Sequence, residues 1–291
     1  MISITAKGGS EVETNSKFLS RSTRSYLWTY FAIAFGLSWL IEIMLALLGI
    51  DLKTASGQVL LSLAASGPAI AAVGLTYLTQ DKIGRRDYWL RIIELRRISA
   101  GWYLIIFLLP PLLFGLAALL DVLSGGSGMA FGKQIGQFIT YPVYLIITLI
   151  LAPFLEELGW RGYALNRLQL RWSALLSSLI LGVLWSLWHL PIFLIKSTYQ
   201  YSLGVGSPAF WTYMISIIPL TILFTWVFNN NSCSTLSAIL FHIMFNTTAE
   251  LFSITERAYA YFVVLEFAAA IVITLIWGTK TLKRSDKCNI T

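Results

Sequence analysis

The sequence has few charged side chains for its length. Only 12% of its 291 residues are Asp, Glu, Lys or Arg, whereas a soluble domain carries about 25%. The apolar fraction is 57% and the mean hydropathy is +0.72. A chain of this composition cannot cover a water-facing surface in the ordinary way, and it is too apolar to be intrinsically disordered.

Cysteine, phased glycine and repeats are also scarce or missing. Two cysteines are too few for a disulfide scaffold or a metal cluster. The 21 glycines follow no period of three, which excludes collagen. The sequence contains no internal repeat, no heptad run and no low-complexity tract. The remaining class is a helical membrane protein with several spans.

Eight stretches are long and apolar enough to cross a bilayer as helices, which takes about 20 mostly apolar residues each. The polar segments between them are short and leave no room for a soluble domain. We therefore expect an all-α fold, a bundle of about eight transmembrane helices that forms a single domain over residues 26–278. The eight stretches are 26–50, 57–79, 101–121, 139–165, 172–195, 209–228, 234–253 and 260–278.

The positive charges favour one orientation of this bundle. With the N-terminus in the cytosol, the inner segments contain 17 Lys and Arg residues and the outer segments contain 4. Because cytosolic loops are enriched in Lys and Arg, we expect cytosolic tails at 1–25 and 279–291 and a multi-pass protein of the cell membrane. Contacts with lipid headgroups then account for the net charge of +7, and no nucleic-acid partner is expected.

Ionisable side chains inside the expected spans are few. Each costs about 2.5–3.5 kcal/mol to place at the centre of a bilayer, so each is a functional candidate. Both histidines of the chain are among them, and histidine is the usual proton carrier and metal ligand near neutral pH. The set is Glu42, Glu156, Glu157, Arg161, His189, His242, Glu250 and Glu266.

Two adjacent glutamates lie near the end of the fourth stretch. Glu157 and Arg161 are four residues apart, so they can pair on one face of a helix. Glu156 points about 100° away and has no local partner. A carboxylate held in a partly dry place is suited to act as a general base. For Glu157 and Arg161, the alternative is a buried ion pair that only locks helices together.

The two histidines lie in different stretches. Pro191 perturbs the helix just after His189 and frees backbone groups there. His242 and Asn246 are four residues apart and share a helix face, where two donors could bind a developing oxyanion. Each site also has a structural alternative. His189 could bond to a backbone carbonyl at a kink, and His242 with Asn246 could form a polar clasp between helices.

Together these groups make a stronger case than each one alone. A carboxylate, two histidines and an asparagine lie on three separate helices. If they converge, they supply a base, a second proton carrier and an oxyanion site. That set is sufficient for the attack of water on a peptide carbonyl.

These residues resemble the motifs of the CPBP family, which contains CAAX-type prenyl endopeptidases and bacteriocin-processing relatives and is described as a family of intramembrane glutamic proteases. The resemblance covers about residues 140–250, and nothing before them matches specifically. Trp185 stands where the family more often has phenylalanine, and we expect it to pack. The three motifs, in order, are Glu156-Glu157-x-x-x-Arg161, Trp185-x-x-x-His189 and His242-x-x-x-Asn246.

The resemblance implies a mechanism and a partner. Glu156 would activate water with help from His189, and His242 with Asn246 would form the oxyanion hole. Glu157 and Arg161 would support these groups. No metal or other cofactor is expected. The substrate would be a lipidated or membrane-tethered peptide or protein, cleaved from the cytosolic side, whose identity the sequence does not give.

The expected depths of these groups do not match. Glu156 would lie about 14 Å from the inner end of its span, and His189 about 26 Å from residue 172, at 1.5 Å per residue. They can meet only if part of 166–176 lies along the membrane surface or if a helix is strongly tilted. Arg167, Arg171 and Trp172 favour a segment at the interface.

Three other functions fit parts of the pattern. Glu156, His189 and His242 form the two-His, one-carboxylate set of many catalytic zinc sites, so a zinc-dependent membrane protease is the main alternative. A non-catalytic scaffold or immunity protein would use the same residues as helix clasps. A transporter would line a path with them, although the sequence shows no inverted repeat.

Overall fold

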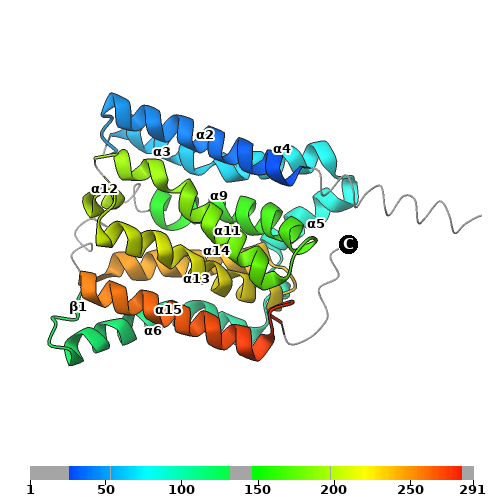
Figure 1. Cartoon of the computed structure of the whole chain (residues 1–291). Helices are drawn as coiled ribbons and strands as arrows, with labels where there is room; N and C mark the ends of the chain where they lie inside the picture. The colour runs from blue at the N-terminus through cyan, green and yellow to red at the C-terminus, as the bar shows by residue number, and fades with distance from the viewer. Residues whose placement is uncertain (1–25, 53, 132–145, 197, 284–291) are drawn as a thin grey trace, which may run out of the picture.

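The computed structural model describes residues 26–52, 54–131, 146–196 and 198–283. These residues form a bundle of helices that lie side by side (Figure 1). The elements are α2 (Leu27–Leu48), α3 (Ala55–Ala65), α4 (Gly67–Thr79), α5 (Lys82–Ile93), η1 (Leu95–Arg97), α6 (Ala100–Leu123), β1 (Met129–Phe131), η2 (Ile147–Leu151), α9 (Ala152–Gly159), η3 (Trp160–Leu165), α10 (Asn166–Gln169), α11 (Ala174–Trp188), η4 (Leu190–Leu194), α12 (Tyr199–Leu203), α13 (Pro208–Asn230), α14 (Thr235–Leu251), β2 (Phe252–Ile254) and α15 (Glu256–Trp277).

The helical membrane fold expected from the sequence is confirmed. Five helices of the described residues are long and apolar enough to cross a bilayer, and a sixth span results if α3 and α4, bent by 46°, count as one. Each of the eight expected stretches contains a helix. Helix α14 has only 17 residues, and the first part of stretch 139–165 lies outside the described residues. The number eight and the single-domain boundaries therefore stay predictions.

The exposed and buried surfaces are those of a protein in lipid. Large apolar side chains point outward, with Leu47 and Leu78 each 82% exposed. Polar and charged groups are buried instead, and Glu157 and Arg161 are 0% exposed. Charged groups in spans face the protein interior because lipid chains cannot solvate them.

The order of the helices places the candidate residues at the centre. In Figure 1, α2 and α4 form one edge of the bundle and α6 and α15 form the other, with α9, α11, α13 and α14 between them. Helix α9 contacts both α4 and α14, and α11 contacts α13. The three helices that carry the predicted motifs are therefore the inner ones.

The fourth helical segment is longer than the apolar stretch 139–165. The segments η2, α9, η3 and α10 follow one another without a break, and Leu151, Trp160 and Asn166 all have helical backbone angles. The helical backbone thus continues to Gln169, and the next helix, α11, begins at Ala174. A segment along the membrane surface within 166–176 stays a prediction.

The structure also contains one short pair of β-strands, which the all-α prediction did not include. Strands β1 and β2 pair antiparallel, with Met129 opposite Ile254. Asp121, at the end of α6, accepts hydrogen bonds from Arg257 and from the backbone of Gly128. These contacts join α6 to the start of α15, and the glycine-rich segment 125–128 forms the turn between α6 and β1.

Candidate active site

Glu157 lies at the centre of a buried polar cluster. Its Oε1 accepts a hydrogen bond from Arg161 Nη1 at 2.7 Å, as the four-residue spacing predicts. The same oxygen accepts a second bond from His242 Nδ1 at 3.0 Å. Because His242 belongs to α14, Glu157 joins α9 and η3 to a third motif far away in the sequence.

Arg161 is enclosed by aromatic rings. Its guanidinium carbon lies 4.5 Å from the ring centre of Trp185 and 4.1 Å from that of Phe224. Cation–π contacts with desolvated rings are worth about 2 kcal/mol or more. They offset part of the cost of burying a guanidinium whose Nε and Nη2 have no hydrogen-bond partner among the described residues.

Glu156 is held by a residue for which the sequence predicted only packing. The indole Nε1 of Trp185 donates a hydrogen bond of 2.8 Å to Glu156 Oε2. Phenylalanine, which the resemblance described above gives as the more frequent residue here, has no such donor. The departure from the family pattern was the signal in the sequence that this bond could exist.

His189 is the C-cap residue that directly follows α11. Trp185 of the same helix fixes the orientation of its ring. His189 Nδ1 donates to the backbone oxygen of Trp185 at 2.8 Å. Because a carbonyl can only accept, Nδ1 carries a hydrogen and Nε2 is the acceptor of the neutral ring. Helix α11 ends at Trp188, and the 3₁₀ turn η4 with Pro191 follows, as the proline predicts.

His242 and Asn246 lie one turn apart on α14. The His242 ring packs edge-on against Trp185 and Phe224, with ring centres 5.4 and 5.5 Å apart. His242 is buried, and Asn246 is half-buried. Trp185 thus contacts Glu156, Arg161 and both histidines, so the motifs converge around one indole.

Two π-helical segments flank α9. Segment η2 precedes it and η3 follows it. Such wider turns change which residues face a neighbour and are frequent at functional sites. Near η3, Tyr88 donates to the carbonyl oxygen of Leu158 at 3.1 Å, and Arg91 donates to that of Gly162 at 3.3 Å. No pattern in the sequence indicates these contacts.

The geometry of the donor groups bears on metal binding. In the described part of the chain, no three His, Cys, Asp or Glu side chains gather in a group that could hold a metal ion. His242 Nδ1 and His189 Nδ1 are both engaged in hydrogen bonds within the protein.

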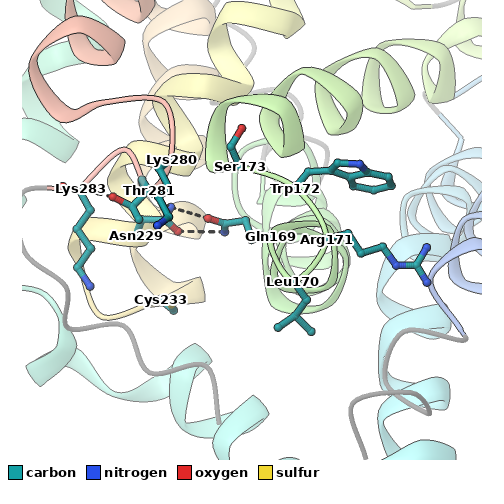
Figure 2. A pocket seen from close by; sticks show the side chains of 10 residues that line it. All are labelled: Gln169, Leu170, Arg171, Trp172, Ser173, Asn229, Cys233, Lys280, Thr281 and Lys283. Atoms are coloured by element: carbon teal, nitrogen blue, oxygen red, sulfur yellow. Dashed lines mark hydrogen bonds between the residues drawn. The ribbon is translucent and has the colours of Figure 1, made fainter. Parts of the chain in front are cut away.

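A sizeable cavity lies away from this cluster. It measures about 490 Å³ and is found where α10 approaches the end of α13 and the chain after α15. Figure 2 shows its paired amides, Gln169 and Asn229, joined by hydrogen bonds of 3.2 and 2.8 Å, with Arg171 pointing away from them. None of the predicted site residues lines it, so the cavity and the polar cluster are separate features.

The described residues thus define a helical membrane protein that buries a carboxylate, Glu157, in contact with His242. Comparison with known proteins narrows that class. Residues 137–248 match the Rce1-like family, described as type II CAAX prenyl endopeptidase Rce1-like. CAAX prenyl protease 2 of Methanococcus maripaludis is 35% identical over 193 residues, which cover 65% of this chain and 70% of that protein. The chain belongs to this family of membrane endopeptidases.

The matched region contains all three motifs. Residues 137–248 span Glu156, His189, His242 and Asn246, and they agree closely with the range 140–250 expected from the motifs. The chain is therefore an integral membrane protease with its candidate site inside the matched region.

Proposed function

We propose that the chain is a metal-independent glutamic endopeptidase that cleaves a lipidated or membrane-tethered protein. The observation that supports this most directly is the bond from Trp185 Nε1 to Glu156 Oε2. It fixes a buried carboxylate against Trp185, whose ring also packs near that of His189, and the second carboxylate oxygen can receive a proton. A fixed, partly desolvated carboxylate is a suitable general base.

In the proposed reaction, Glu156 takes a proton from water while the water oxygen attacks the peptide carbonyl carbon. His189 presents Nε2 as an acceptor that shares this proton. The negative charge that develops on the carbonyl oxygen is stabilised by His242 and Asn246. One preorganised oxyanion donor is worth about 2.7–4 kcal/mol in the transition state.

The role of His242 depends on its protonation. Its Nδ1 already donates to Glu157, so it can donate from Nε2 only if both ring nitrogens carry a hydrogen. The carboxylate of Glu157 stabilises this charged ring at a distance of 3.0 Å. Arg161 in turn fixes the orientation of Glu157. Glu157 and Arg161 are therefore positioning residues in this proposal.

We extend the substrate class of the relative to this chain. The curated relative is named a CAAX prenyl protease, so a prenylated C-terminal peptide is the first substrate to test. The cytosolic location of both tails and of the cleavage remains part of the proposal, and its support is the split of 17 to 4 positive residues. The membrane itself is expected to be the cell membrane.

The direct test measures peptide cleavage by purified protein with and without a chelator, beside a metal analysis of the same sample. Glutamic catalysis predicts full activity in excess chelator and nearly complete loss in Glu156→Gln, which keeps the shape but cannot take the proton. His189→Ala should be severely impaired yet folded. Chelator-sensitive activity with about one zinc per chain would refute glutamic catalysis and support a zinc-dependent membrane protease instead.

The substrate can be sought by trapping. Glu156→Gln should still bind its substrate while no longer cutting it. Cells that hold this variant should accumulate an uncut membrane protein that cells with the wild type do not. Normal function of Glu156→Gln in cells would instead indicate a non-catalytic scaffold, because a clasp tolerates an amide in place of the carboxylate.

A further inference from the structure

A third buried carboxyl group lies on α2, outside the matched family region. Glu42 is 3% exposed. Its Oε2 is closed off from solvent and has no hydrogen-bond partner among the described residues. Glu156 and Glu157, by contrast, each accept a hydrogen bond from a neighbouring side chain. Glu42 is thus a titratable group that the reaction described above does not use.

The buried face of α2 points toward the candidate active site. Trp39, three residues before Glu42, donates from Nε1 to the backbone oxygen of Trp188 at 3.0 Å, directly before His189. Helix α2 also packs against η4, the turn that follows this histidine. Glu42 therefore lies on the face that contacts the histidine end of α11.

Electrostatic contacts place Glu42 in the same group. Glu42 lies within electrostatic range of Glu156, and Tyr213 of α13 lies within that range of both carboxyl groups. The Tyr213 ring packs edge-on against His189, with ring centres 5.9 Å apart. Among the described residues, Glu156 and Tyr213 are therefore the titratable groups within electrostatic range of Glu42, and His189 packs against Tyr213.

The charged and hydrogen-bonding groups around Glu42 bear on whether its carboxyl group holds a proton. Within the described part of the site, Glu157 accepts hydrogen bonds from Arg161 and His242, and Glu156 accepts one from Trp185, whereas Glu42 Oε2 has no such partner. An ionised Glu42 would add an unpaired negative charge in a membrane interior, where such charges are strongly unfavourable. The buried and unpartnered Glu42 is therefore the carboxyl group of the site that is suited to hold a proton at rest.

We propose that Glu42 is the general acid that protonates the leaving amine, a role that rests on the proposed peptidase function. Water gives one proton to Glu156 and its oxygen bonds to the carbonyl carbon. As the C–N bond breaks, Glu42 gives its proton to the nitrogen. Transfer of the proton from Glu156 to Glu42, through His189 or water, restores the resting state, so one water is consumed for each bond cut.

The test compares two leaving groups on one acyl segment. A lipidated peptide must have its amine protonated, whereas the matching 4-nitrophenyl ester releases a stable anion without a proton. In Glu42→Gln, peptide turnover should fall about 10²- to 10³-fold, the usual effect of a general acid. Ester turnover should change less than about threefold, because base and oxyanion site are intact. Equal loss of both reactions, or loss of neither, would overturn the assignment.

Further variants keep the result interpretable. Glu266→Gln is the matched control, because Glu266 is a 0% exposed carboxyl whose oxygens both lack partners among the described residues; it should leave both reactions unchanged. If Glu42→Gln fails to fold, Glu42→Asp and Glu42→Asn give the same comparison, and Glu42→Asp should show more peptide turnover than Glu42→Asn because it keeps a carboxyl group.

A variant of the proposed base separates the two proposals. Glu156→Gln should lose both reactions. Peptide cleavage that persists there would refute the proposed function itself, whereas its loss beside a fully active Glu42→Gln refutes only the role of Glu42.

Discussion

Trp185 contacts the proposed base, the buried arginine and both histidines. Trp185→Phe keeps an aromatic ring but removes the hydrogen bond to Glu156 Oε2. A bond to a charged acceptor is worth about 1.5–3 kcal/mol, so we expect kcat for peptide cleavage to fall about 10- to 100-fold. The matched control is Trp188→Phe, because the buried Trp188 Nε1 has no partner among the described residues. Equal kcat values for the two variants would contradict a positioning role for Trp185.

Arg161 gives a prediction about stability as well as activity. Arg161→Ala leaves Glu157 charged and buried, which costs about 3–5 kcal/mol. Glu157→Gln should act in the same direction. We expect a lower Tm in detergent and lower turnover, while Arg86→Ala on the exposed surface of α5 should change neither. Unchanged Tm and turnover in Arg161→Ala would show that the ion pair is not structural.

Asn246 is predicted to act on turnover alone. Asn246→Ala removes one expected oxyanion donor from the half-buried face of α14. Loss of such a donor lowers kcat about 10²- to 10³-fold. KM and Tm should stay close to the wild-type values. A peptide-cleavage assay in which kcat does not change would remove Asn246 from the site.

At the level of elements, α9 packs closely against α4 at Gly159, next to the two glutamates. A Cβ there would lie 2.4 Å from Tyr30 Oη and 2.7 Å from the backbone carbon of Pro68. Gly159→Ala should therefore push α9 away from α4 and lower stability by about 1–3 kcal/mol. Gly115→Ala is the control, because nothing lies within 4 Å of its Cβ. Similar Tm values for the two variants would show that α9 can shift freely.

Some of these elements can be predicted from the sequence and others cannot. The apolar stretches reveal each long helix, since about 20 such residues suffice for a span, and Pro191 marks the end of α11. The π-helical turns around α9 could not be foreseen, because the same residues also favour an α-helix. The continuation of the fourth helix to Gln169 was missed because polar residues from Asn166 onward look like a loop when only hydropathy is read.

The site was predictable to the extent that its contacts are local. The pair of Glu157 and Arg161 follows from their spacing on one helix. The bond from Trp185 to Glu156, and that from His242 to Glu157, join different helices. Such contacts depend on how the helices are arranged relative to one another. The spacing of residues within one helix carries no information about that arrangement. Membership of a family with the same three motifs supplied the grouping that the spacing alone did not.

For the whole molecule, the distribution of Lys and Arg predicts the orientation in the membrane. Reporters inserted after Gly125 and after Arg96 should lie on opposite sides, with Arg96 in the cytosol. Both positions are in turns or short segments between long helices, so an insertion there should leave the bundle intact. Reporter signals from the same side for both positions would refute the expected topology.

The buried polar cluster also limits how the protein can be engineered. Lipid chains are as apolar as leucine, so burial of leucine gives helices in a bilayer little reason to associate. Association then depends on close packing, as at Gly159, and on the few polar contacts around Glu157 and Trp185. A selection for heat resistance will reject most changes in this cluster, whether or not the enzyme is assayed. Stabilising substitutions should instead accumulate on the lipid-facing sides of α6 and α15.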